Sequence, residues 1–194
     1  MLYKEFKDKH KGQKIIISGC GVSASELTEP SKHITMGVND IGRLYTSNYL
    51  VVLNDKSSFK PERWTWVEKS ACPYIFTHIK GLAVKEESKI LLQLGRYGGC
   101  DLEKDAVDYT SNSPYVACII AAYMGFTKIG LLGVDFTNNH FFENTGEHTL
   151  SKKIGVINKE YSTLKDAMSR KGIELINLSS TSKLQIPRQT IVEF

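Results

Sequence analysis

Short apolar runs alternate along the chain with longer amphipathic stretches, and this alternation predicts strands and helices in turn. The apolar runs are rich in branched residues and are followed by polar residues or glycine, as buried parallel strands usually are. The predicted strands are Lys14–Ser18, His33–Val38, Tyr49–Leu53, Tyr74–Thr77, Lys128–Leu132 and Glu174–Leu178. The predicted helices are Leu2–Lys11, Ser25–Glu29, Phe59–Lys69, Ser113–Met124 and Ser151–Lys171.

The last of these helices shows the clearest period and ends at Gly172, a residue typical of a helix C-terminus. Its apolar residues recur at three- and four-residue steps: Ile154, Ile157, Tyr161, Leu164 and Met168. Strands that alternate with helices predict a Rossmann-like α/β fold, an open and mostly parallel sheet with helices on both faces.

The composition narrows the class of protein. A chain of 194 residues with 41% hydrophobic residues is long enough for a core and predicts one domain over 1–194. The net charge of +4 forms no long basic run beyond the first fourteen residues, which is weak evidence for nucleic-acid binding. The four cysteines form no C-x-x-C pair, and no apolar stretch has the length of a membrane span. We therefore expect a cytoplasmic protein with free thiols and no membrane span.

Ligands of open α/β sheets bind outside the carboxyl ends of the strands. The segments that follow the predicted strands read "SGCGVS", "GVNDIG", "LNDKS", "GVDFTNNH" and "SSTSK". Asn, Asp, Ser and Gly are ordinary turn residues, but these segments are more polar than chain reversal alone requires. They are the candidate ligand-binding segments.

The stretch "IIISGCGVSASEL" fits the dinucleotide fingerprint at Gly19, Gly21 and Ala24. Asp40 lies sixteen residues after Ala24, near the place of the acidic residue that holds a ribose. No Tyr-x-x-x-Lys pair for hydride transfer follows. The fingerprint supports a tight glycine turn whose backbone N–H groups, at a helix start, face an anion.

A second segment, "TSNSPYVACIIAAYMGFTKIGLLGVDF", places Thr110, Ser111 and Asn112 just before Pro114 at a helix start. The helix is apolar nearly all round, which predicts that it is buried. Its first N–H groups would then point into the cleft. Simple N-capping explains one of the three polar residues well and all three less well.

This segment resembles the T-S-G, helix and "lGykeIyLxGiDF" pattern of the bacterial sialyltransferases of glycosyltransferase family 42 and their phage and archaeal relatives. In the same order, "SGCGVSASEL" is similar to the family's G-N-G-P-S-L loop, "GVNDIGRLY" to its C-N-Q-F strand end, and "VVLNDKSSF" to a strand that ends in Asn. "GEHTLSKKIGVINKEYSTLKD" resembles its G-H-S segment and last long helix, and "LINLSSTSKL" its final strand and serine loop. The likeness runs along nearly the whole chain and implies a variant of the GT-A architecture.

The resemblance implies a donor-binding site at the strand ends and a histidine that acts as catalytic base. The residues it places around the nucleotide or sugar, with their neighbours in the same segments, are Gly19, Cys20, Gly21, Ser23, Asn39, Asn54, Thr110, Ser111, Asn112, Asp135, Ser179 and Ser180. The base falls on His148, and His140 in "NNHFF" is its rival.

Four departures from the family pattern fall at positions where the family contacts the donor or leaving group. Cys20 replaces an asparagine and Val22 a proline, no arginine stands near Asp108 before the T-S cap, and Thr137 follows the D-F pair in place of a tyrosine. These departures distinguish the donor site of this chain from that of the family.

An inverting transfer to an alcohol needs a base and groups that steady the departing phosphate. Imidazole titrates near neutrality, which suits His148 for the first task. The two histidines, Asp135, Glu143 and Glu147 match no compact ligand motif such as H-E-x-x-H, and the family works without metal. We expect no metal and no cofactor beyond the donor substrate.

The sequence thus favours a sialyltransferase-like glycosyltransferase that moves a sugar from a nucleotide-activated donor, CMP-type by resemblance, to a hydroxyl acceptor with inversion. Two alternatives stay open: a nucleotide-dependent diphosphokinase-like enzyme, as linked to archaeal relatives, and a non-catalytic nucleotide- or sugar-binding phage protein. The acceptor is a glycan, a small molecule, a protein or a modified nucleic acid. We expect the protein in the cytoplasm of a bacterial cell or a phage-infected host, as a monomer or homo-oligomer.

Overall fold

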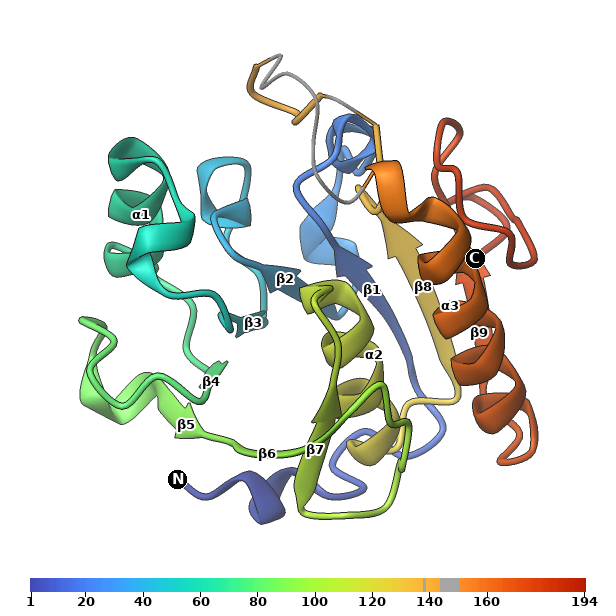
Figure 1. The fold of residues 1–194 in the computed structure, drawn as a ribbon, viewed down its shortest axis with the longest axis horizontal. Coiled ribbons are helices and arrows are strands. Elements are labelled where there is room, and N and C mark those ends of the chain that lie inside the picture. The colour runs from blue at the N-terminus through green and yellow to red at the C-terminus, as the bar shows by residue number, and fades with distance from the viewer. Residues whose placement is uncertain (138, 144–150) are drawn as a thin grey trace.

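The computed structural model describes residues 1–137, 139–143 and 151–194. Within them, seven strands form one sheet in the order β5-β4-β3-β2-β1-β8-β9, and every neighbouring pair is parallel (Figure 1). The strands are β1 (Lys14–Ser18), β2 (Thr35–Val38), β3 (Tyr49–Val51), β4 (Ile75–Thr77), β5 (Lys89–Leu91), β8 (Lys128–Leu132) and β9 (Glu174–Asn177). The remaining pair, β6 (Gln93–Tyr97) and β7 (Ala106–Tyr109), forms a separate two-stranded sheet.

Side chains alternate between the two faces of the main sheet, and each face has its own cover. Ile15 and Ile17 of β1 lie in the large core with the helices α2 (Ser113–Tyr123) and α3 (Ile154–Ser169). Ile16 points to the other face, as does Leu50 of β3, which packs with α1 (Pro61–Glu68). Helices lie on both faces, so the predicted α/β fold is confirmed.

The helix α2 is almost wholly buried and packs against β1, β2 and β8 in the middle of the sheet (Figure 1). Its burial explains why its sequence is apolar nearly all round. The helix α3 is amphipathic, and it buries Ile157, Tyr161 and Leu164 on one side while Val156 stays exposed. No helix among the described residues has the length and apolarity to cross a membrane.

The predicted strands agree with the structure to within two residues at each end, and β1 and β8 have the predicted bounds. The predictions failed for two short helices: Leu2–Lys11 contains a 3₁₀ turn at Tyr3–Phe6, and Ser25–Glu29 falls at another, Val22–Glu26. Asp8 has a φ of +55°, which ends any helix near the N-terminus. Short segments also lack the length that makes a helix stable without much tertiary contact.

The prediction of the last helix was too long at its N-terminus, where a 3₁₀ turn, Ser151–Lys153, precedes α3. The prediction also missed β5, β6 and β7. Most residues of β6 are exposed and polar, so that strand carries no apolar run to reveal it. The other 3₁₀ turns are Pro30–Lys32, Ile41–Arg43, Lys56–Ser58 and Glu86–Ser88.

We expect Ile120→Ala to lower the free energy of unfolding by about 2–5 kcal/mol, because this fully buried side chain of α2 would leave a cavity. Urea denaturation followed by circular dichroism measures the change. Val156→Ala, at a position 61% exposed, is the control and should change stability by less than about 0.5 kcal/mol. Equal effects of the two substitutions would contradict the packing described for α2.

Candidate functional site

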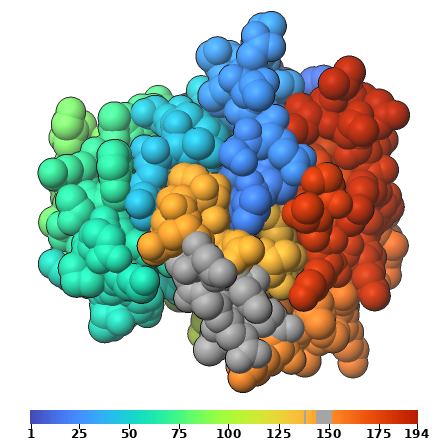
Figure 2. Space-filling model, turned by 90° about the horizontal axis from the view of Figure 1, so that it is seen from above, coloured from blue at the N-terminus to red at the C-terminus, as the bar shows by residue number. Residues whose placement is uncertain are grey.

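A pocket of about 370 Å³ lies where the strand order changes direction. Strand β1 has β2 on one side and β8, from much later in the chain, on the other. Open α/β sheets bind ligands at such a switch point, beyond the carboxyl ends of the strands. Figure 2 looks onto this end of the molecule, where the segments after β1, β2, β8 and β9 meet.

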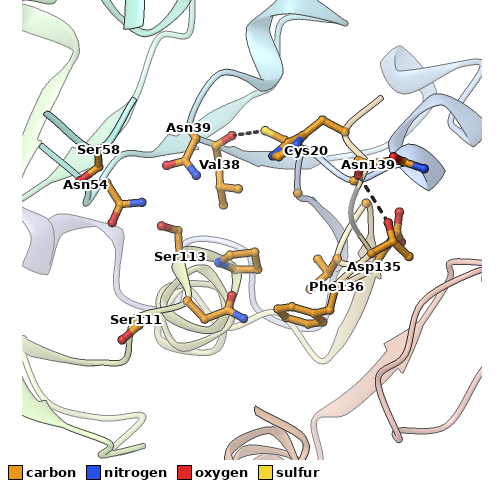
Figure 3. A pocket seen from close by; sticks show the side chains of 18 of the residues that line it. Cys20, Val38, Asn39, Asn54, Ser58, Ser111, Ser113, Asp135, Phe136 and Asn139 are labelled. Carbon is orange, nitrogen blue, oxygen red and sulfur yellow. Dashed lines mark hydrogen bonds between the residues drawn. The ribbon is translucent and has the colours of Figure 1, made fainter. Parts of the chain in front are cut away.

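The pocket walls come from the segments that follow β1, β2, β3 and β8 and from the start of α2 (Figure 3). Of the predicted site residues, the structure brings together eight here: Gly19, Cys20, Gly21, Asn39, Asn54, Ser111, Asn112 and Asp135. Ser23, Thr110, Ser179 and Ser180 do not line it. His148 lies outside the described residues, so its role stays a prediction.

Asp135 joins three of the segments around the pocket. Its buried carboxylate accepts hydrogen bonds from Ser23 N (2.8 Å), Ser23 Oγ (2.6 Å) and Ser179 Oγ (2.7 Å). Ser23 follows β1 and Ser179 follows β9, while Asp135 itself follows β8. Ser23 and Ser179 therefore do not line the pocket but hold the Asp135 carboxylate that does. Ser180 is exposed and donates to Glu26 instead (2.7 Å).

The glycine turn after β1 packs closely against the end of β8 and the Asp135 carboxylate. The N–H groups of Gly19 and Gly21 donate to the carbonyls of Leu132 (2.8 Å) and Gly133 (2.7 Å). A Cβ on Gly21 would lie against the Asp135 carboxylate. The N–H groups of Gly19 and Gly21 are therefore used by the end of β8 and the residue after it, and the N–H of Ser23 at the helix start faces the Asp135 carboxylate.

Two amide atoms in the pocket wall are buried and have no hydrogen-bond partner among the described residues: Asn39 Oδ1 and Asn112 Nδ2. Asn39 has a φ of +54°, and its backbone N–H donates to Val51 (3.0 Å). Asn112 is 3% exposed at the N-cap of α2, yet its side chain makes no cap hydrogen bond. Its Oδ1 accepts from the hydroxyl of Tyr161 (3.4 Å).

Buried polar atoms are nearly always paired, so an acceptor and a donor left without partners in one pocket suit a polar ligand. Figure 3 shows Asn39 and Asn54 on the wall opposite Ser111 and Ser113. The Oγ of Ser111 also forms a hydrogen bond of 2.9 Å with the hydroxyl of Tyr97 on β6. Thr110 accepts from the backbone of Asn112 (3.2 Å) and so shapes the helix start.

The wall between β1 and β2 contains Cys20, which is buried. Its thiol donates to the carbonyl of Val38 and to Asp40 Oδ1, both at 3.5 Å. Burial, and then the charge of Asp40, raise the pKa of Cys20 well above its usual value, so the group stays a neutral thiol. Asp40 in turn binds Arg63, a pocket residue that the sequence did not reveal because it lies on α1, away from any strand end.

His140 lines the pocket and is half-buried. It pairs with Gly21 as an isolated antiparallel bridge, and its ring stacks on Phe142 with 5.2 Å between centroids. The rival catalytic base therefore lies at the pocket. The described residues contain no group of three or more His, Cys, Asp and Glu side chains arranged to hold a metal ion.

No protein-family model and no curated protein matches this sequence. Among solved structures, the sialyltransferase CstII from Campylobacter jejuni in complex with the substrate analogue CMP-3FNeuAc matches with a TM-score of 0.51 and 14% identity, over 88% of this chain and 83% of that one. The fold is that of a sialyltransferase. The same enzyme in complex with a trisaccharide acceptor and CMP matches at a TM-score of 0.52 and 15% identity, over the same shares. The architecture implied by the sequence resemblance is confirmed.

We expect Ser179→Ala to cost about 1.5–3 kcal/mol of stability, the usual range for a hydrogen bond to a charged group. The loss would leave Asp135 short of one donor. Ser180→Ala, at the exposed neighbour, is the matched control and should stay within about 0.5 kcal/mol of the wild type. Thermal and urea unfolding of both variants measure the difference, and a Ser180→Ala effect as large as that of Ser179→Ala would contradict this account.

Proposed function

We propose that this protein is a glycosyltransferase that moves a sugar from a CMP-linked donor to a hydroxyl acceptor with inversion. The observation that carries the proposal is a pair of buried amide atoms, Asn39 Oδ1 and Asn112 Nδ2, which have no partner in the described part of the chain and lie in a pocket at the switch point of a sialyltransferase fold. Such a pair needs a ligand with both donors and acceptors, which a nucleotide provides.

The size and lining of the pocket support a mononucleotide-linked donor. A volume of about 370 Å³ lies in the lower part of the range for small-ligand sites. Its wall combines the amides with the rings of Phe59 and Phe136, which offer apolar surface to a base or sugar ring. The matched sialyltransferase structures hold CMP or a CMP-sugar analogue, and this favours a cytidine donor here.

In the proposed reaction, the acceptor oxygen forms a bond to the anomeric carbon while the bond from that carbon to the phosphate oxygen breaks. The electron pair of the broken bond leaves with the nucleotide phosphate. The proton of the acceptor hydroxyl passes to a histidine, which acts as general base. Attack from the face opposite the phosphate inverts the anomeric centre.

His148 is the base that the sequence resemblance implies, and we propose it for this role. His140 is the alternative with a described position, since it lines the pocket. Mutation distinguishes the two histidines. Replacing the base should abolish turnover and preserve donor binding, whereas replacing the other histidine should preserve both.

We expect CMP to raise the unfolding temperature of the protein. A ligand at about 100 times its dissociation constant adds about 2.7 kcal/mol to the stability of the folded state. A thermal-shift series should compare CMP with other nucleotides, with and without magnesium. No response to any nucleotide would contradict the proposal, and a magnesium-dependent preference for purine triphosphates would favour the diphosphokinase-like alternative.

We expect His148→Ala to lower turnover by about 10²–10⁴, the usual contribution of a general base, while the shift produced by CMP is kept. Release of CMP from CMP-N-acetylneuraminic acid, with water or an added sugar as acceptor, measures turnover. His140→Ala is the comparison variant and should lose less than about tenfold. If only His140→Ala abolishes turnover, the base is His140; if neither variant changes it, neither of these two histidines acts as base.

A further inference from the structure

Arg63 is the one arginine among the described residues that lines the pocket. It lies on α1, and its guanidinium is held by Asp40 through two hydrogen bonds, Nε to Oδ2 (2.9 Å) and Nη2 to Oδ1 (2.5 Å). The Asp40 carboxylate is fully buried. A bidentate pair of this kind fixes the plane of the guanidinium, which has five N–H donors and uses two of them on Asp40.

The charges around Asp40 do not balance. Arg43 places a second guanidinium 3.9 Å from Asp40 Oδ2, so two positive groups share one carboxylate. Arg43 Nη1 is buried and has no hydrogen-bond partner among the described residues. Glu143 is paired with Lys60 (3.5 Å). Arg63 therefore lines the pocket beside a carboxylate that it shares with a second guanidinium.

Phe142 stabilises the two guanidinium groups. Its ring centroid lies 3.7 Å from the Arg43 guanidinium carbon and 5.4 Å from that of Arg63. The ring of Phe59 lies 5.4 Å from Arg63 as well. Cations over aromatic faces are favourable, and here the rings also limit how far the guanidinium groups move.

Among the described residues, Lys153 before α3 is the other lysine or arginine that lines the pocket, whereas Asp108, in the region where the family pattern has an arginine, does not line it. Its carboxylate accepts from the backbone N–H groups of Arg96 (2.7 Å) and Asp101 (3.0 Å), which is a structural task. Another departure from the pattern, Cys20, donates its thiol hydrogen to Asp40 Oδ1 (3.5 Å). Cys20 thus lies next to the carboxylate that holds Arg63.

We propose that Arg63 binds the phosphate of the donor and stabilises the charge that this phosphate gains as the sugar leaves, with Asp40 and Cys20 as positioning residues. The inference rests on the proposed function, since it assigns the phosphate subsite of the same pocket. As the bond between the anomeric carbon and the phosphate oxygen breaks, its electron pair stays on the phosphate. A guanidinium held in place before the reaction stabilises that charge without reorganisation.

The test compares the affinity for CMP with that for cytidine, because only the phosphate differs. Isothermal titration on the wild type, Arg63→Gln and Arg63→Lys gives the ratio of the two dissociation constants. We expect Arg63→Gln to lower the preference for CMP by about ten- to hundredfold and to leave the affinity for cytidine within about twofold. Arg63→Lys, which keeps the charge but not the planar fork, should lose less of the preference.

Two further variants make the result decisive. Arg170→Gln removes one positive charge from the exposed end of α3 and should keep the wild-type ratio. If Arg63→Gln does not fold by circular dichroism, the double variant Asp40→Asn with Arg63→Gln removes the buried charge together with its partner and supplies the measurement.

A folded Arg63 variant that keeps the full preference for CMP would overturn the role of Arg63 while leaving the proposed function standing. A wild-type protein that binds neither CMP nor cytidine would contradict the proposed function, and the inference with it. A preference for CMP that falls equally in Arg170→Gln would also overturn the inference, because it would report net charge and not a contact.

Discussion

Asp135 is the acceptor on which the geometry of the pocket depends, because segments from three distant parts of the chain donate to its carboxylate or carry it. A buried carboxylate is costly unless it is fully hydrogen-bonded, and Ser23 and Ser179 supply that compensation. The same constraint explains Gly21, whose missing side chain leaves room for the carboxylate. The pocket floor is thus fixed before any ligand enters.

The remaining walls follow from where β1 sits in the sheet. Strand β2 lies on one side of it and β8 on the other, and the start of α2 lines the pocket beyond their carboxyl ends. The helix α2 is buried along nearly its whole length, and Asn112 at its N-cap is buried as well. Burial leaves Asn112 Nδ2 without water and without a partner in the described part of the chain, a condition that favours a ligand there.

The lining of the pocket combines neutral and charged side chains, and the two kinds suit different parts of the proposed donor. The amides and hydroxyl of Asn39, Asn54 and Ser111 suit its base and sugar. The Arg63 guanidinium, held by Asp40, suits its phosphate. The buried thiol of Cys20 donates to the same Asp40 carboxylate, which explains its place in the glycine turn.

The sequence alone determined the parallel α/β core, because buried strands such as β1 and β8 appear as continuous apolar runs whatever lies around them. It also indicated the pocket, since Asn39, Asn54 and Ser111 follow strands or precede a helix at the same edge of the sheet. It did not reveal β6, whose residues are mostly exposed, nor the short 3₁₀ turns, whose form depends on tertiary contacts. Only the tertiary structure showed that Ser179 bonds to Asp135 whereas Ser180 bonds to Glu26. It also placed the glycine turn against Asp135 and Arg63 against Asp40. Those outcomes depend on contacts between residues far apart in the chain, and local pattern carries no information about such contacts.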